Sequence, residues 1–136
     1  MYAEVSGFYA RQMRHLDEGA VAEWAKTFTM DAVFHISTRA EPMRGRAELA
    51  AGAGAAVKAI VALGEVRRHM TGMYEIEERP GGLLHVRAYT IVYATSAEGQ
   101  SRVHQVCTCT DTLVRNTVEG RELQVKERHV IVDGTA

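Results

Sequence analysis

The sequence predicts an α+β fold in which three N-terminal helices pack on a strongly curved, mostly antiparallel sheet. Apolar residues recur at three- and four-residue spacing before Gly64, as they do on one face of a helix. After Gly64 the chain consists of β-prone runs separated by turn residues. A length of 136 residues suits one domain, so we expect residues 1–136 to form a single unit with its own core.

Three helices are expected in the first half of the chain. The first follows the apolar spacing of residues 5–16, and a turn at "LDEG" separates it from a second, short helix at 21–28. A strand is expected at 33–37, where "DAVFHIS" is too short for a helix. The third helix, from "RAEL" onward, ends at Gly64, because glycine commonly closes helices in a left-handed conformation.

Four strands are predicted after Gly64, at residues 67–78, 83–95, 101–115 and 121–132. The turns between them, "RPGG", "SAEGQ" and "NTVEG", are short, so consecutive strands should form an antiparallel meander. Such a sheet, covered by helices, can form a cone around an apolar internal pocket. The direction of His69 stays open, because simple alternation places it on a polar face unless a bulge at Gly72 reverses the pattern.

Composition excludes several classes of function. The formal net charge of −1 gives no basic footprint for nucleic acid or an acidic membrane surface, and no apolar run is long enough to span a membrane. The N-terminus does not look like a signal peptide, so we expect a cytoplasmic protein. Cys107 and Cys109 point the same way on a strand and should be buried thiols. No metal-binding motif is present, and we expect neither a metal site nor a cofactor.

Several side chains are candidates for a functional site. Asp17 could cap the second helix or take part in chemistry, and His69 could be structural or catalytic. The candidates for contact with a substrate are aromatic, sulfur-containing or imidazole side chains: Tyr9, Met13, Trp24, His35, Met73, Tyr89 and His104. Trp24 and Met73 should pack on a ring system, while Tyr89 and His104 should donate to a developing oxyanion. The alternative for the aromatic and sulfur-containing side chains is that they only fill the core, and the strand residues His35, Tyr89 and His104 could also point out of the cavity.

The segments "LDEGAVAEWAKTFTMDAVFHI", "RGRAEL", "RRHMTGMYEIE" and "VHQVCTCTDTLVR" resemble the SnoaL-like branch of the nuclear-transport-factor-2-like superfamily. That branch includes polyketide cyclases and scytalone dehydratase. In its dehydratase-like members an aspartate ending the first helix pairs with a histidine on the strand after the third helix, and Asp17 and His69 fall at those places. The resemblance implies a catalytic pair. Leu16 replaces the tyrosine of scytalone dehydratase, which argues against that particular reaction.

These observations together predict a cofactor-independent acid–base enzyme acting on a small, apolar, oxygenated ring compound. Its most concrete form is a cyclase or dehydratase of polyketide or other aromatic secondary metabolism, in the lyase or isomerase class. The alternatives are an epoxide-opening cyclase or hydrolase, and a non-catalytic ligand-binding or dimerisation module. Apolar residues on both faces of 83–95 also predict a homodimer formed through the outer face of the sheet.

Overall fold

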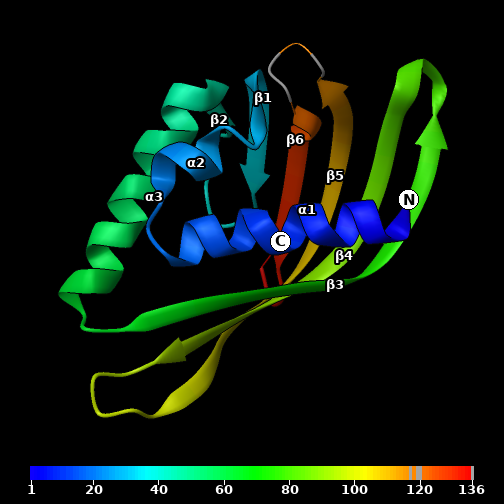
Figure 1. Cartoon of the computed structure of the whole chain (residues 1–136). Coiled ribbons are helices and arrows are strands. Elements are labelled where there is room, and N and C mark those ends of the chain that lie inside the picture. The colour runs from blue at the N-terminus through cyan, green and yellow to red at the C-terminus, as the bar shows by residue number, and fades with distance from the viewer. Residues whose placement is uncertain (117, 119–120, 136) are drawn as a thin grey trace.

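Three helices pack on one six-stranded sheet in the computed structural model, which describes residues 1–116, 118 and 121–135 (Figure 1). The elements in chain order are α1 (Tyr2–Asp17), α2 (Val21–Ala25), β1 (Phe28–Ile36), β2 (Met43–Arg44), α3 (Gly45–Ala62), β3 (Val66–Arg79), β4 (Leu83–Thr95), β5 (Ser101–Asn116) and β6 (Arg121–Val132). A single 3₁₀ turn at Pro80–Gly82 connects β3 to β4. The predicted α+β class is confirmed.

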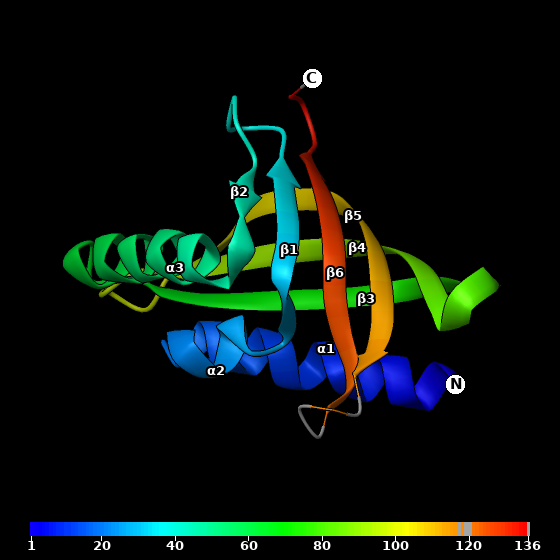
Figure 2. The same ribbon diagram turned by 90° about the horizontal axis from the view of Figure 1, so that it is seen from above.

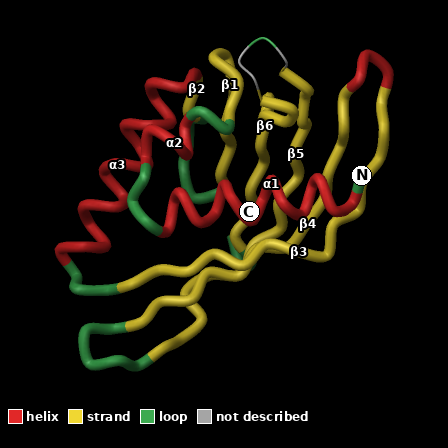
Figure 3. The backbone as a smooth tube through the Cα atoms, viewed as in Figure 1, coloured by secondary structure: helices red, strands yellow, loops and turns green. Residues whose placement is uncertain are grey.

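The sheet has the strand order β2-β1-β6-β5-β4-β3. All neighbouring strands are antiparallel except β1 and β6, which run parallel. The predicted meander of four strands is therefore present as β3 to β6 (Figure 3). The long strands bend strongly, with α1 lying along β3 and α3 packing near β1 (Figures 1 and 2). None of the described helices has the length and apolar character of a membrane span.

The region between α1 and α3 differs most from the sequence prediction. The second helix covers only five residues, and β1 already begins at Phe28, five residues before the predicted strand. Phe28 is fully buried. A single apolar residue at this position fits the last turn of a short helix and the first residue of a strand equally well, so periodicity could not assign it. The two-residue strand β2 is too short to leave a pattern in the sequence.

Aromatic side chains of α1 and α2 pack against the inner face of the sheet. The Tyr9 ring of α1 stacks on Tyr74 of β3 at a centroid distance of 5.1 Å. Trp24 of α2 meets Phe28 edge-on at 4.7 Å, which closes the core between α2 and β1. Both cysteines lie in the buried inward-facing row of β5 and are free thiols, as predicted.

A buried polar network crosses this apolar core. The Arg128 guanidinium of β6 contacts the Asp111 carboxylate of β5 at 2.8 Å, and their side chains are 3% and 0% exposed. The Tyr9 hydroxyl donates to Asp111 at 2.5 Å, and Arg128 donates to Gln12 of α1 at 2.6 Å. Burial and the Asp111 charge raise the pKa of Tyr9 well above its usual value. Burial alone would lower the pKa of Arg128, but Asp111 raises it, so the guanidinium stays charged.

Candidate active site

A β-bulge in β3 decides the direction of His69. His69 lies opposite Val92, whose side chain is buried on the inner face of the sheet. The register shifts between Gly72 and Glu75, and beyond the shift Ile76 packs against the same core. His69 and Ile76 therefore share the inner face although their spacing is odd. Of the two alternatives left open for His69, the structure confirms the bulge at Gly72.

Asp17 and His69 are in direct contact, although 52 residues separate them in the chain. Asp17 is the last residue of α1, and its Oδ1 lies 2.6 Å from His69 Nδ1. Its Oδ2 also accepts a hydrogen bond of 3.0 Å from the His69 backbone N–H. The N-cap position of α2 is Ala20, so the interpretation of Asp17 as a helix cap is wrong.

The hydrogen bond between Nδ1 and Asp17 fixes the tautomer and the orientation of the imidazole, and the bond from the His69 backbone holds the carboxylate in place. A carboxylate can only accept hydrogen bonds, so Nδ1 carries the proton and Nε2 is the free basic nitrogen. Within the described part of the chain, Nε2 has no hydrogen-bond partner. The Asp17 carboxylate also stabilises the charged imidazole after it has taken a proton. The side chains of His69 and Asp17 are only 21% and 9% exposed, which limits competition by water.

Two hollows border this pair. The smaller, of about 370 Å³, lies between the end of α1, α3 and strands β3 to β5, and its walls are largely aliphatic: Leu16, Val57, Ile60, Val61, Val66 and Val92. The larger, of about 940 Å³, runs between α1 and β3 and includes the charged side chains of Arg14 and Arg68. The smaller hollow combines aliphatic walls with polar and charged side chains, an arrangement that suits a small oxygenated molecule.

The polar groups of the smaller hollow gather near His69. Arg67 contacts Glu65 at 2.8 Å, and Arg102 contacts the same carboxylate at 3.1 Å. Hydrogen bonds from these two arginines lower the pKa of Glu65. The pKa of His104 is lowered by burial and by the charges of Arg67 and Arg102, which favours the neutral ring at neutral pH. An arginine paired with Glu65 and a neutral imidazole therefore line the same hollow as His69.

Three of the seven residues predicted to contact a substrate lie at these hollows. Tyr9 and Met13 line the larger hollow, and His104 lines the smaller one with His69. Trp24 lies in the core, only 3% exposed, and its indole Nε1 has no hydrogen-bond partner among the described residues. Trp24 therefore packs on Phe28, and neither hollow includes it.

The other three residues lie on the outer face, which corrects their predicted place in the pocket. Tyr89 pairs with Thr108 in the outward row of β4 and is 56% exposed. Met73 occupies the bulge itself, with φ of 57° and 76% exposure. His35 lies opposite His129, also on the outward row. Alternation alone could not assign these faces, since a shift of one residue exchanges the two sides of a strand.

Arg67, Gln105 and Val57 of the smaller hollow were not predicted from the sequence. Arg67 stands two residues before His69, so strand alternation would have placed both on one face. Gln105 lies opposite Val92 in the register of β4 and β5, and Val57 approaches only through the packing of α3. Neither of these last two positions has a signal in the local sequence.

The chain is similar to a known domain family over nearly its whole length. The SnoaL-like domain matches residues 1–129 of the chain. Among curated proteins, no relative matches. Similar solved structures include Aln2 from a Streptomyces species, with 33% identity, a TM-score of 0.87, and coverage of 97% of this chain and 90% of that one.

Two further structures extend the comparison. ActVI-ORFA from Streptomyces coelicolor has 29% identity and a TM-score of 0.89, covering 99% of this chain and 96% of that one. A protein from Catenulispora acidiphila in complex with S-DNPA has 37% identity and a TM-score of 0.82, covering 97% of this chain and 92% of that one. The likeness therefore extends over almost the whole length of each protein.

Proposed function

The chain belongs to the SnoaL-like family, and on that basis we propose that it is an acid–base enzyme for a small, apolar, oxygenated ring compound. The reaction is a cyclisation or a dehydration of the polyketide type that this family includes, and it needs no metal or organic cofactor. The contact between His69 Nδ1 and Asp17 Oδ1 carries the proposal. It joins a base to an orienting carboxylate at the wall of an apolar hollow.

A dehydration would use each feature of the pair. Nε2 of His69 takes a proton from a carbon next to a carbonyl, and the electrons of that C–H bond form an enolate. The enolate then collapses to a carbon–carbon double bond. The C–O bond on the neighbouring carbon breaks, and the hydroxyl leaves as water with the proton that His69 returns. Asp17 stabilises the charged ring between the two transfers, while Arg67 supports the negative charge on the carbonyl oxygen.

The smaller hollow is the proposed place of the substrate. Its volume of about 370 Å³ falls within the range of small-molecule pockets, and aliphatic side chains from α1, α3 and β4 form its walls. The end of α1 contributes Asp17 and Glu18, while the polar groups of His69, Arg67 and His104 come from the strands. An apolar ring would therefore contact the helices while its oxygens face the strands.

S-DNPA is a suitable first probe for this site, since the Catenulispora acidiphila protein of 37% identity is described in complex with it. We expect S-DNPA to bind to this protein in a calorimetric titration. The variant Val57→Trp should weaken binding at least about tenfold, because the indole fills the hollow. Ala59→Trp, at an exposed position of α3, is the matched control and should bind as the unchanged protein does. Absent binding, or equal binding by Val57→Trp, would count against the site.

The outer face of the sheet is the proposed dimer interface. It exposes apolar side chains from four neighbouring strands: Met70, Met73, Tyr89, Val103, Val106 and Ile131. Register places Met70, Ile91 and Val106 side by side in one row. A contiguous apolar face of this kind is unusual on a monomer. Arg87 and Glu75 on this face pair with each other, so the pair carries no net charge that would repel a second copy.

Light scattering at micromolar concentration should therefore report a dimer. Val106→Glu should shift the protein to monomers, because it would place two buried charges at the interface. Leu63→Glu changes another exposed apolar residue, beyond the end of α3, and this control should remain dimeric. A monomeric unchanged protein, or a dimer that tolerates Val106→Glu, would contradict the proposed interface.

A further inference from the structure

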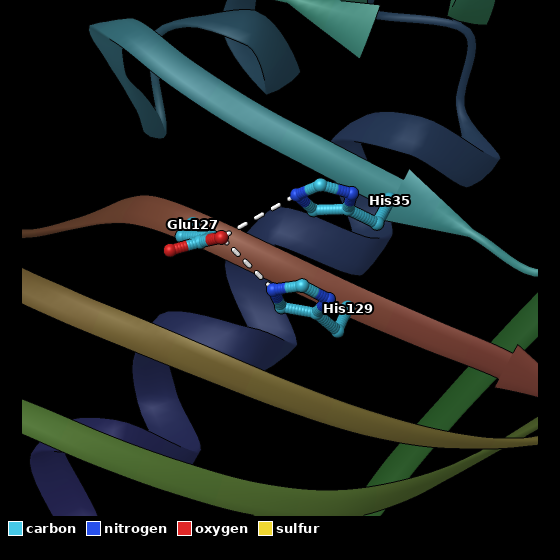
Figure 4. A group of neighbouring side chains, drawn as sticks. All are labelled: His35, Glu127 and His129. Carbon is cyan, nitrogen blue, oxygen red and sulfur yellow. Dashed lines mark hydrogen bonds and ion pairs between the residues drawn. The ribbon is translucent and has the colours of Figure 1, made fainter. Parts of the chain in front are cut away.

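Three side chains that can bind a metal converge on the outer face of the sheet, away from the Asp17–His69 pair (Figure 4). They are His35 of β1 and Glu127 and His129 of β6. The parallel register of β1 and β6 sets His35 directly opposite His129. Glu127 stands two residues before His129 and therefore points to the same face. Nothing in the spacing along the chain reveals this group, because the pairing of two distant strands creates it.

Both imidazoles direct a nitrogen toward one carboxylate oxygen. Glu127 Oε1 lies 3.4 Å from His35 Nε2 and 2.9 Å from His129 Nε2 (Figure 4). The two rings are stacked, with centroids 4.1 Å apart and planes 5° from parallel. A divalent cation between the three ligand atoms would satisfy all of them, with both imidazoles neutral.

The dimensions suit a tetrahedral ion. Ligand atoms bound to Zn²⁺ at about 2.0–2.1 Å in tetrahedral geometry are about 3.4 Å apart. The candidate ligand atoms all lie within 4.8 Å of one another, so each separation has to change by at most about 1.4 Å. The side chains are 36%, 46% and 50% exposed, and they have room to make that adjustment and to admit an ion.

We propose that His35, Glu127 and His129 form a binding site for a divalent transition-metal ion, with Zn²⁺ as the reference ion. Two imidazoles and one carboxylate are a donor set that zinc accepts, whereas Mg²⁺ prefers oxygen ligands alone. The three protein ligands leave a fourth position for water or a ligand from outside the chain. The site is separate from the proposed catalytic pair, and neither depends on the other.

Calorimetric titration of the tag-free, metal-free protein with Zn²⁺ tests the proposal. We expect one ion per chain, no response to Mg²⁺, and a melting temperature that rises when Zn²⁺ is present. His35→Ala and His129→Ala should each weaken Zn²⁺ binding by more than about 10-fold, since loss of even a supporting partner of a metal ligand costs about 10–100-fold. Glu127→Gln should also weaken it, without removing either imidazole.

His15→Ala is the matched control, because it removes one imidazole from α1 and leaves the group on the sheet unchanged. This variant should bind Zn²⁺ as the unchanged protein does. Melting temperatures measured without metal establish that each variant is folded. Zn²⁺ binding that persists in both His35→Ala and His129→Ala, or that is lost equally in His15→Ala, would overturn the site. So would the absence of any binding to the unchanged protein.

Discussion

His69→Ala should lower the turnover of the natural substrate by about 10²–10⁴-fold while the melting temperature stays close to that of the unchanged protein. The loss follows from removing the base, since among the described residues only His69 presents an imidazole to the Asp17 carboxylate. The fold should persist because His69 is partly exposed and belongs to no part of the apolar core.

The substrate for this assay can be obtained from the variant itself. A folded His69→Ala protein should still bind its substrate but fail to convert it, so mass spectrometry of compounds that co-purify with the variant identifies the molecule to test. His15→Ala serves as the control for the loss of one imidazole outside the hollows and should keep full activity. Full activity of a well-folded His69→Ala protein would leave His69 a structural residue.

Asp111→Asn should destabilise the protein by about 3–5 kcal/mol. The substitution preserves the shape of the side chain but removes the negative charge that balances Arg128, whose side chain is 3% exposed. An uncompensated guanidinium would then remain in the core, close to the rings of Tyr9 and Phe28. Tyr9 would also lose its charged hydrogen-bond acceptor.

The free energy of unfolding in urea measures this effect. Asp133→Asn, at an exposed position after β6, is the matched control and should change stability by less than about 0.5 kcal/mol. The double variant Asp111→Leu with Arg128→Met removes both charges together, and it should cost less than Asp111→Asn alone. A loss below about 1 kcal/mol in Asp111→Asn would show that the ion pair does not support the core.

The order of the elements could be predicted from the sequence because periodicity and turn residues are local signals. The four strands after Gly64 begin and end within one or two residues of their expected bounds. The inner and outer faces of β3 were harder to predict, since a single extra residue at the bulge after Gly72 reverses the alternation. For this reason Met73 lies on the opposite side of the sheet from its predicted place, whereas Tyr89 points outward by the regular alternation of β4.

The candidate site could be predicted only where the family resemblance supplied the pairing. Asp17 and His69 are far apart in the chain, and neither has a local pattern that distinguishes it from a helix cap or a structural histidine. The buried Asp111–Arg128 pair was missed, although an acidic residue in the same row as Cys107 and Cys109 is unusual for an inward-facing strand position. The pairing of His35 with His129 depends wholly on the parallel contact of β1 and β6.

The cooperation of Asp17 with His69 is the central claim, and a double-substitution cycle tests it most directly. Turnover is measured for the unchanged protein, Asp17→Asn, His69→Ala and the variant that carries both substitutions. If the carboxylate acts only by orienting the imidazole and stabilising its charged form, the double variant should be no slower than His69→Ala, because Asp17 has nothing left to act on. Losses that multiply in the double variant, or an Asp17→Asn protein with unchanged turnover, would contradict the pair.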